Sequence, residues 1–165
     1  MKKPTKQHGK PDNIIVGFTG HRRLYHPEKA IEKRLRETLH DLNPKKCISG
    51  MAYGFDQLAA NVAFYMNIPF IAAVPSKDQA ARWSKRIIMQ YNRLLEKAEK
   101  VVYVDKEMGK ENGPYIPKLF ARNKWILEHS DFIVAYKVKE YGGTASLVAL
   151  ADLNKVEVFN LTEIL

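Results

Sequence analysis

The feature that most constrains the fold is a regular alternation of short apolar runs with longer segments of helical spacing. Six apolar runs, each bounded by turn residues, predict strands at 14–19, 47–49, 69–74, 101–104, 132–136 and 156–160. The segments between them predict helices at 28–42, 55–66, 79–97, 117–129 and 144–153. Strand followed by helix, repeated along the chain, predicts an α/β protein with a mostly parallel sheet.

The expected architecture is a Rossmann-like three-layer α/β/α sandwich. A parallel sheet needs helices on both faces, and this agrees with strands that are short and almost wholly apolar. A chain of 165 residues fits one such domain. We therefore predict a flexible basic tail at 1–13 and a single Rossmann-like domain at 14–165. The least regular stretch, 105–117, is predicted to be a mobile lid or rim loop.

The charge and composition narrow the range of partners. The formal net charge is +9, and the tail supplies part of this excess, so the rest suits an anionic ligand of any size from a mononucleotide to DNA. No apolar stretch approaches the roughly 20 residues of a membrane span, and the amino terminus has no apolar signal core. With one cysteine, Cys47, in an apolar run, the sequence predicts a cytoplasmic protein without a membrane partner. His21 and His26 lack further ligands at metal-site spacing, so no metal is expected.

The first loop that is predicted to carry chemistry follows the first strand. In doubly wound sheets the ligand lies beyond the carboxyl ends of the strands. There the chain reads Thr19, Gly20, His21 and Arg22, so that small residues let the backbone approach a ligand and a guanidinium group follows at once. Phosphate recognition is the predicted use, and a solvated arginine is the alternative.

The second loop is a glycine-containing turn that opens directly into a helix. It contains Ser49, Gly50, Tyr53, Gly54 and Asp56. Free backbone amides and the positive end of the helix dipole would face an anion here. Asp56 is predicted either to cap the helix or to contact a ligand hydroxyl. The turn is neither a GxGxxG fingerprint nor a GK[ST] motif, which disfavours a nicotinamide cofactor and a Walker-type ATPase.

The third loop adds Pro75 and two aromatic residues. Trp83 and Tyr91 are eight residues apart and so share one face of the helix predicted at 79–97. Tyr91 is predicted to belong to the core. Trp83, which lies among charged and polar neighbours, is the predicted stacking residue for a base.

The last predicted site elements lie near the carboxyl end of the chain. Arg122 and Asn123 fall on a helix, and Gly142, Gly143 and Thr144 lead into the final helix. A second amide-rich helix start would thus face the same edge of the sheet. The alternative is an ordinary glycine pair in a turn between strand and helix.

These residues resemble the SLOG superfamily, the Rossmann-like group that joins the Smf/DprA DNA-processing proteins with LOG-type phosphoribohydrolases. The segment SGMAYGFD at 49–56 is similar to the SGxAxGxD turn of the DNA-processing proteins, where the turn meets phosphate. The downstream residues 122–124, 130–131 and 142–144 resemble the arginine, strand and glycine signature of both branches. Residues 19–22, together with Trp83 and Tyr91, make the chain most similar to the small stand-alone YpsA-like proteins.

The resemblance implies a nucleotide-binding domain and leaves three functions open. The leading hypothesis is a protein that binds a nucleotide or sugar phosphate, acts as a ligand-sensing module and requires no cofactor. The first alternative is a nucleoside phosphate N-glycosidase or phosphoribohydrolase, with Asp56 and Arg122 as catalytic candidates. The glutamate that follows the LOG glycines has no counterpart before Asp152. The second alternative is single-stranded nucleic-acid binding, and a homodimer is implied by related folds.

Overall fold

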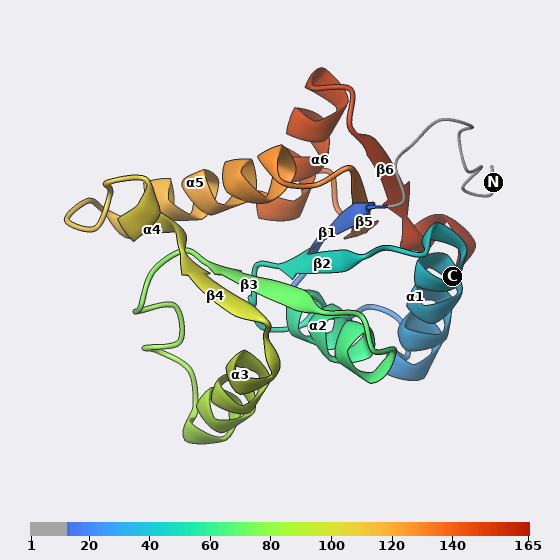
Figure 1. Cartoon of the computed structure of the whole chain (residues 1–165), viewed down its shortest axis with the longest axis horizontal. Coiled ribbons are helices and arrows are strands. Elements are labelled where there is room, and N and C mark those ends of the chain that lie inside the picture. Colours follow the sequence, from blue (N-terminus) through green and yellow to red (C-terminus); the bar gives the residue numbers. More distant parts are fainter. Residues whose placement is uncertain (1–12) are drawn as a thin grey trace.

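The computed structural model describes residues 13–165, and its centre is one six-stranded sheet (Figure 1). The strands are β1 (Ile15–Gly20), β2 (Lys46–Ser49), β3 (Phe70–Val74), β4 (Lys100–Tyr103), β5 (Phe132–Tyr136) and β6 (Glu157–Asn160). Their order is β4-β3-β2-β1-β5-β6, and every pairing is parallel. The prediction of a Rossmann-like, parallel α/β sheet is confirmed.

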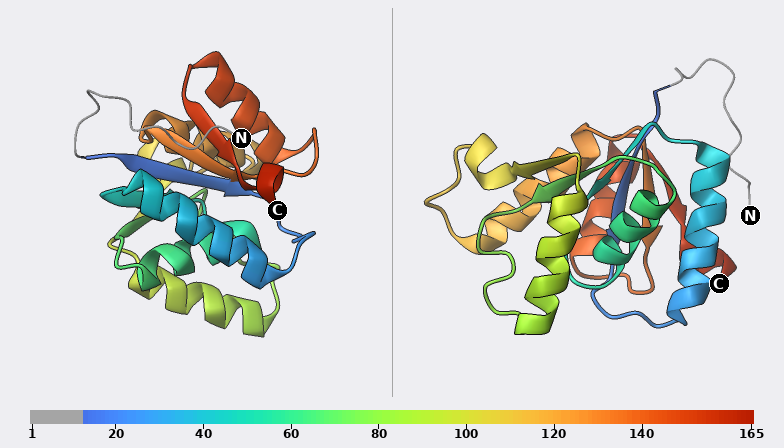
Figure 2. Two further views of the ribbon diagram at one scale, coloured as in Figure 1. Left: turned by 90° about the vertical axis from the view of Figure 1, so that its right-hand side faces the viewer. Right: turned by 60° about the horizontal axis from the view of Figure 1, so that its bottom comes forward.

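The helices cover both faces of this sheet, which completes the three layers. They are α1 (Glu28–Leu42), α2 (Phe55–Tyr65), α3 (Lys85–Lys97), α4 (Val104–Glu107), α5 (Tyr115–Glu128), α6 (Gly143–Leu153) and the 3-10 helix η1 (Leu161–Ile164). The chain first steps from β1 to β4 in one direction, so right-handed crossovers place α1, α2 and α3 on one face. It then crosses back to β5, which places α5 and α6 on the opposite face (Figures 1 and 2).

Each face of the sheet has its own apolar core. On the α1–α3 face, Phe18 and Val134 of the sheet pack with Leu35 and Phe55 of the helices. On the α5–α6 face, Ile133 packs with Trp125, Ile126 and Leu147 in a second cluster. The reversal of direction lies between β1 and β5, because each has its next strand on the opposite side. This reversal is the topological switch point, where ligands of such folds bind.

The predicted elements differ from the observed ones mainly at helix starts. All six strands and the helix at 28–42 are present, and none of their boundaries differs from the prediction by more than one residue. The predicted helix at 79–97 is wrong in its first turns, because α3 begins only at Lys85. The Ser84 side chain accepts a hydrogen bond from the Ile87 amide at 3.4 Å and so caps this later start. Residues 77–82 form turns instead, and Trp83 lies in a bend.

The predicted lid segment 105–117 is held by a buried ion pair. The Lys118 ammonium lies 3.0 Å from the Asp105 carboxylate, and it also donates to the Glu111 carbonyl at 2.7 Å. The short helix α4 occupies the start of this segment, where the sequence predicts no helix. Closure of the segment over a ligand stays a prediction.

Three further predictions concern the tail, the membrane and metal binding. The predicted basic tail at 1–13 lies outside the described residues except for Asn13. Among the described residues, no helix is long and apolar enough to cross a membrane. No group of three or more histidine, cysteine or acidic side chains in residues 13–165 is arranged to hold a metal ion.

Candidate functional site

The loops that follow β1, β2 and β5 meet at the switch point. Gly20 pairs with Tyr136 at the ends of β1 and β5. Beyond this pair, the His21 amide donates to the Tyr136 carbonyl at 3.3 Å, and the Phe55 amide of α2 donates to the His21 carbonyl at 3.1 Å. The predicted residues Thr19 to Arg22 therefore lie against the turn that opens α2. Thr19 itself is buried in the strand.

Three of the predicted site glycines allow other parts of the protein to pack closely against them. A Cβ atom at Gly20 would lie 2.3 Å from the Phe55 ring, and one at Gly50 would lie 2.5 Å from the Arg122 guanidinium. A Cβ atom at Gly54 would lie 2.2 Å from the backbone carbonyl oxygen of Arg22. The sequence explained these glycines by the approach of a ligand. The structure shows that they also let three parts of the site pack on one another.

The turn before α2 presents unpaired backbone amides. Gly54 has φ +92° and ψ −125°, a conformation for glycine alone, and it precedes α2 without a side-chain cap. Ser49 shapes the turn by accepting from the Met51 amide at 3.2 Å and donating to the Asp56 carbonyl at 2.8 Å. Within residues 13–165, the amides of Tyr53 and Gly54 donate to no partner. Successive free amides at a helix start are an anion-binding arrangement.

Asp56 lies buried beneath this turn. The first of the two predictions for Asp56, a helix cap, is wrong, because Gly54 occupies the N-cap position and Asp56 lies within α2. Its Oδ2 accepts from the Ala52 amide at 3.3 Å. Its Oδ1 is the one buried side-chain polar atom of the described chain without a hydrogen-bond partner. Burial raises the pKa of Asp56 to about 6, although the charges of Arg122 and Arg22 and the amides of Ala52 and Gly20 lower it in part.

Arg122 reaches the same turn from the other face of the sheet. Its Nη1 donates to the Gly50 carbonyl, and its Nε donates to Asn123 Oδ1 at 3.1 Å. Nη2 donates to no group in the described part of the chain. Burial lowers the pKa of Arg122, and the Asp56 carboxylate opposes that effect. The buried guanidinium thus carries positive charge to the turn with one nitrogen unused.

The second glycine-bearing helix start is open to solvent. A Cβ atom at Gly142 or Gly143 would have no other atom within 4 Å, and Gly142 precedes α6 without a side-chain cap. Asn123 joins this start to Arg122 by donating to the Gly143 carbonyl at 3.4 Å. Thr144 is buried in the first turn of α6. The structure therefore brings the predicted 142–144 segment beside Arg122.

His21 ties the loop after β1 to the loop after β5. Its Nε2 accepts from the Val138 and Lys139 amides at 2.9 and 3.1 Å, so this nitrogen carries no proton. Partial burial lowers the pKa of His21, and the charges of Lys139 and Lys137 lower it further. Sequence reasoning placed His21 at the ligand, whereas the structure uses its ring to fix the geometry of the site.

Acidification is expected to weaken the hydrogen bonds that His21 accepts from the Val138 and Lys139 amides. Because the pKa of His21 is lower in the folded chain, the stability it confers is present above the unfolded value of about 6.5 and is lost as the pH falls through the folded value. The difference in unfolding free energy between the wild type and His21→Gln should therefore shrink on acidification. Urea unfolding across this pH range measures it, with His40→Gln, at a side chain that is 85% exposed, as the control. A pH-independent difference would contradict this reading.

Two predicted residues of the third loop lie away from the turn. Pro75 is buried, and its carbonyl accepts from the Asp105 amide at 3.3 Å. Trp83 is half-buried in a bend rather than on a helix, and its ring meets the Tyr91 ring edge-on at 5.3 Å. The prediction that both aromatic residues share a helix is wrong, because α3 begins after Trp83. Tyr91 is buried in the core cluster, as the sequence predicted.

Sequence reasoning missed several polar residues that support the site. Gln79 donates to the Gly50 carbonyl at 2.9 Å and accepts from the Tyr91 hydroxyl at 2.9 Å. The Tyr136 hydroxyl accepts from the Tyr25 amide at 2.9 Å and contacts His26 Nδ1 at 2.7 Å. These residues lie far apart in the sequence, so no local spacing signals their contacts. A tyrosine that ends a buried strand was the one available hint.

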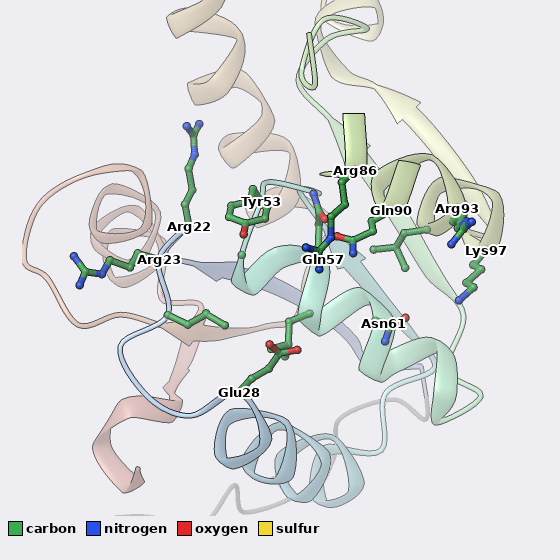
Figure 3. A pocket seen from close by; sticks show the side chains of 14 residues that line it. Arg22, Arg23, Glu28, Tyr53, Gln57, Asn61, Arg86, Gln90, Arg93 and Lys97 are labelled. Carbon is green, nitrogen blue, oxygen red and sulfur yellow. The ribbon is translucent and has the colours of Figure 1, made fainter. Parts of the chain in front are cut away.

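A polar cleft of about 940 Å³ opens beside the turn, between α2 and α3 (Figure 3). Arg22, Tyr53 and Gly54 line it at the end nearest the switch point. The remaining polar lining comes from Arg23, Glu28, Gln57, Asn61, Arg86, Gln90, Arg93 and Lys97. Five of the lining side chains are cationic and one is acidic, so the cleft suits an anion.

Comparisons with known proteins agree with the fold. The chain is 30% identical, over 128 residues, to the uncharacterized SPbeta prophage-derived protein YoqJ of Bacillus subtilis strain 168, a match that covers 71% of this chain and 75% of that protein. The fold matches DNA processing protein A (DprA) of Streptococcus pneumoniae with a TM-score of 0.68 at 20% identity, over 90% of this chain.

A second solved structure concerns the single-stranded DNA binding mode of DNA processing protein A from Helicobacter pylori. It matches with a TM-score of 0.65 at 19% identity, over 89% of this chain. The chain spans 50% of the Streptococcus structure and 64% of the Helicobacter structure, and at these identities the likeness shows a shared fold. The model of the YspA SLOG family (YpsA) matches residues 18–158, and the chain belongs to this family.

Proposed function

We propose that the protein binds a nucleotide or sugar phosphate at the switch point and acts as a ligand-sensing module. The observation that carries the proposal is the turn that opens α2. Two free amides, those of Tyr53 and Gly54, adjoin the Arg22 loop, and the buried Arg122 guanidinium contacts the same turn. Amides at a helix start, joined by guanidinium groups, form a phosphate site.

The roles of the residues follow from their positions. The phosphate accepts from the Tyr53 and Gly54 amides and pairs with Arg22, which is exposed. The unused Nη2 of Arg122 supplies a further donor from below. Asp56 Oδ1 lacks a donor, and a ligand hydroxyl that enters beneath the turn would satisfy it. A ribose phosphate carries both of the groups that these residues require.

A thermal-shift screen tests the proposal. The panel contains nucleoside mono-, di- and triphosphates, cyclic nucleotides, adenosine-diphosphate-ribose-type compounds and ribose phosphates, with chromatography of each mixture for released base. A ligand that binds the native state alone raises the melting temperature. We expect a shift without released base. Release of base would favour the phosphoribohydrolase alternative, and no shift with any compound would overturn the small-ligand proposal.

Loss of Arg22 or Arg122 is expected to weaken this ligand by about tenfold or more, because a hydrogen bond to a charged group contributes about 1.5–3 kcal/mol. Titration calorimetry of Arg122→Gln and Arg22→Gln with the ligand found in the screen measures the loss. Arg22 is exposed and has no ion pair among the described residues, so Arg22→Gln separates binding from folding. Lys33→Gln, on the outer face of α1, is the matched control. Equal affinities for all variants would contradict the assignment.

Binding of single-stranded nucleic acid is the second candidate function. It is favoured by the net charge of +9 and by the fold shared with the Helicobacter pylori protein whose single-stranded DNA binding is described. A chain this basic binds any polyanion weakly at low salt. Affinity that persists near physiological salt is therefore the result that supports this function.

A further inference from the structure

We propose that the cleft between α2 and α3 carries the phosphodiester backbone of a single-stranded nucleic acid away from the switch-point site. The inference rests on the second candidate function and gives it a place on the molecule. Two parts of the cleft then have different roles: the end at Gly54 takes one phosphate group, and the stretch along α3 takes the chain beyond it.

The cations of the cleft are spaced along its length. Arg86, Arg93 and Lys97 lie on one side of α3, and the eleven steps from Arg86 to Lys97 span about 16 Å at 1.5 Å per residue. Arg22 and Arg23 extend this positive surface at the other end of the cleft (Figure 3). A row of cations of this length matches a chain of phosphates better than a single small anion.

Two of these cations are available to a ligand. Arg86 and Arg93 are exposed, and neither forms an ion pair or a side-chain hydrogen bond in the part of the chain that the structure describes. Glu28 is the one acid of the lining, and it too has no ion pair within residues 13–165. Uncompensated cations that line one concave surface attract a polyanion and repel one another without it.

One aromatic ring lines the cleft, and two more lie beyond its lining, beside Lys97. Tyr53 is 44% exposed and lies between Arg22 and Arg86 in Figure 3. At the far end, the Lys97 ammonium lies 5.0 Å from the centre of the Phe64 ring and 5.1 Å from that of the Tyr65 ring, and both rings are exposed. Unpaired bases stack on such rings, whereas a duplex keeps its bases stacked on one another. The aromatic residues therefore favour a single strand.

Uncharged polar side chains also line the cleft, together with Leu24, Leu58 and Leu94. Gln57 and Asn61 lie one helical turn apart on α2, and Gln90 faces the same cleft from α3. Amide side chains both donate and accept hydrogen bonds, so they suit phosphate, sugar and base edges without selecting one base. The volume of about 940 Å³ is at the upper end of the usual range for small-ligand pockets, which leaves room for more than one nucleotide.

A pair of charge-matched double variants tests the proposal. Arg86→Gln with Arg93→Gln removes two cations of the cleft, and Lys33→Gln with Arg36→Gln removes two exposed cations of α1 that line no described cleft. Both proteins keep the basic segment 1–12 and have equal net charge. Fluorescence anisotropy with labelled oligothymidylate and oligouridylate of about twelve nucleotides, at several salt concentrations, measures binding.

The cleft variant should bind oligonucleotides more weakly, and its affinity should depend less on salt concentration. Two lost phosphate contacts reduce the slope of log K against log salt by about 1.4, and affinity near 0.15 M salt falls by about tenfold. The α1 variant should keep the wild-type slope and affinity. The DNA and RNA probes show which sugar the cleft accepts, and an unlabelled duplex should compete poorly.

Different results overturn different proposals. Equal losses in both double variants, or none in the cleft variant, would overturn the cleft proposal while nucleic-acid binding itself stands. Equal competition by the duplex would overturn the preference for a single strand. No oligonucleotide binding near physiological salt would overturn both the cleft and the second candidate function. The cleft variant should keep the wild-type thermal shift with a mononucleotide. If a mononucleotide causes no thermal shift in the wild type, that result counts against the switch-point site alone.

Discussion

Gly54→Ala is expected to destabilise the protein by about 2 to 6 kcal/mol and to abolish phosphate binding at the switch point. The backbone of Gly54 adopts φ +92°, where an L side chain is strained by about 1–3 kcal/mol. The new Cβ would also lie 2.2 Å from the Arg22 carbonyl oxygen, which is backbone and cannot rotate away. Separating the two loops to relieve this clash adds about 1–3 kcal/mol.

Gly143→Ala is the matched control for this variant. Gly143 also opens a helix, yet no atom lies within 4 Å of its Cβ position and its φ is not in the positive region. Its replacement should change stability by about 0.5 kcal/mol or less. Urea unfolding of both variants measures the difference, and the thermal shift with the screened ligand measures binding. A Gly54→Ala protein with wild-type stability and wild-type ligand response would show that the interlocked loops do not form the site.

The fold could be predicted because its signals are local. An apolar run of four to six residues between turns marks a buried parallel strand, and the repeat of Ile31, Leu35 and Leu39 marks the buried side of α1. The start of α3 could not be placed this way. Residues 79–84 have helix-compatible composition, yet in the structure Ser84 caps α3 and Trp83 packs against Tyr91 from outside the helix.

The sequence indicated which loops lie together at the switch point, but not how those loops are held together. Glycine turns after strands indicate an edge where ligands bind, and this pointed to the loops that the structure brings together at the switch point. Contacts such as Gly50 with Arg122, or His21 with the Val138 amide, join residues about 70 to 120 positions apart. Neither residue type nor spacing carries that information, which arises from the order of the strands.

The cleft between α2 and α3 was missed for a related reason. Arg86 and Arg93 look like ordinary solvated residues of an amphipathic helix, and Gln57 belongs to a different element. They form one surface only because β2, β3 and β4 are neighbours, which sets α2 beside α3. In the sequence, Arg86 is close to Trp83, whereas the aromatic ring that shares the cleft with it is Tyr53 of a distant turn.

Asp56→Asn is expected to stabilise the free protein at neutral pH and to weaken ligand binding. Burial raises the pKa of Asp56 from 3.8 to about 6. Between these values the unfolded chain has already released the proton that the folded chain still holds, so the free energy of unfolding falls as the pH rises from about 4 to about 6. Above pH 6 the buried charge costs the folded state about 3 kcal/mol, because each tenfold change in proton affinity corresponds to about 1.36 kcal/mol.

Asparagine keeps an oxygen for the Ala52 amide and carries no charge to bury. The variant should therefore unfold at higher urea than the wild type at pH 7 and converge with it near pH 4, where both side chains are neutral in the folded chain. Ligand affinity should fall by about tenfold or more at pH 7, since a charged acceptor for the ligand hydroxyl is lost. A variant less stable than the wild type at pH 7 would mean that attraction to Arg122 outweighs the cost of burial. Greater stability with weaker binding would instead identify Asp56 as a group kept charged for the ligand.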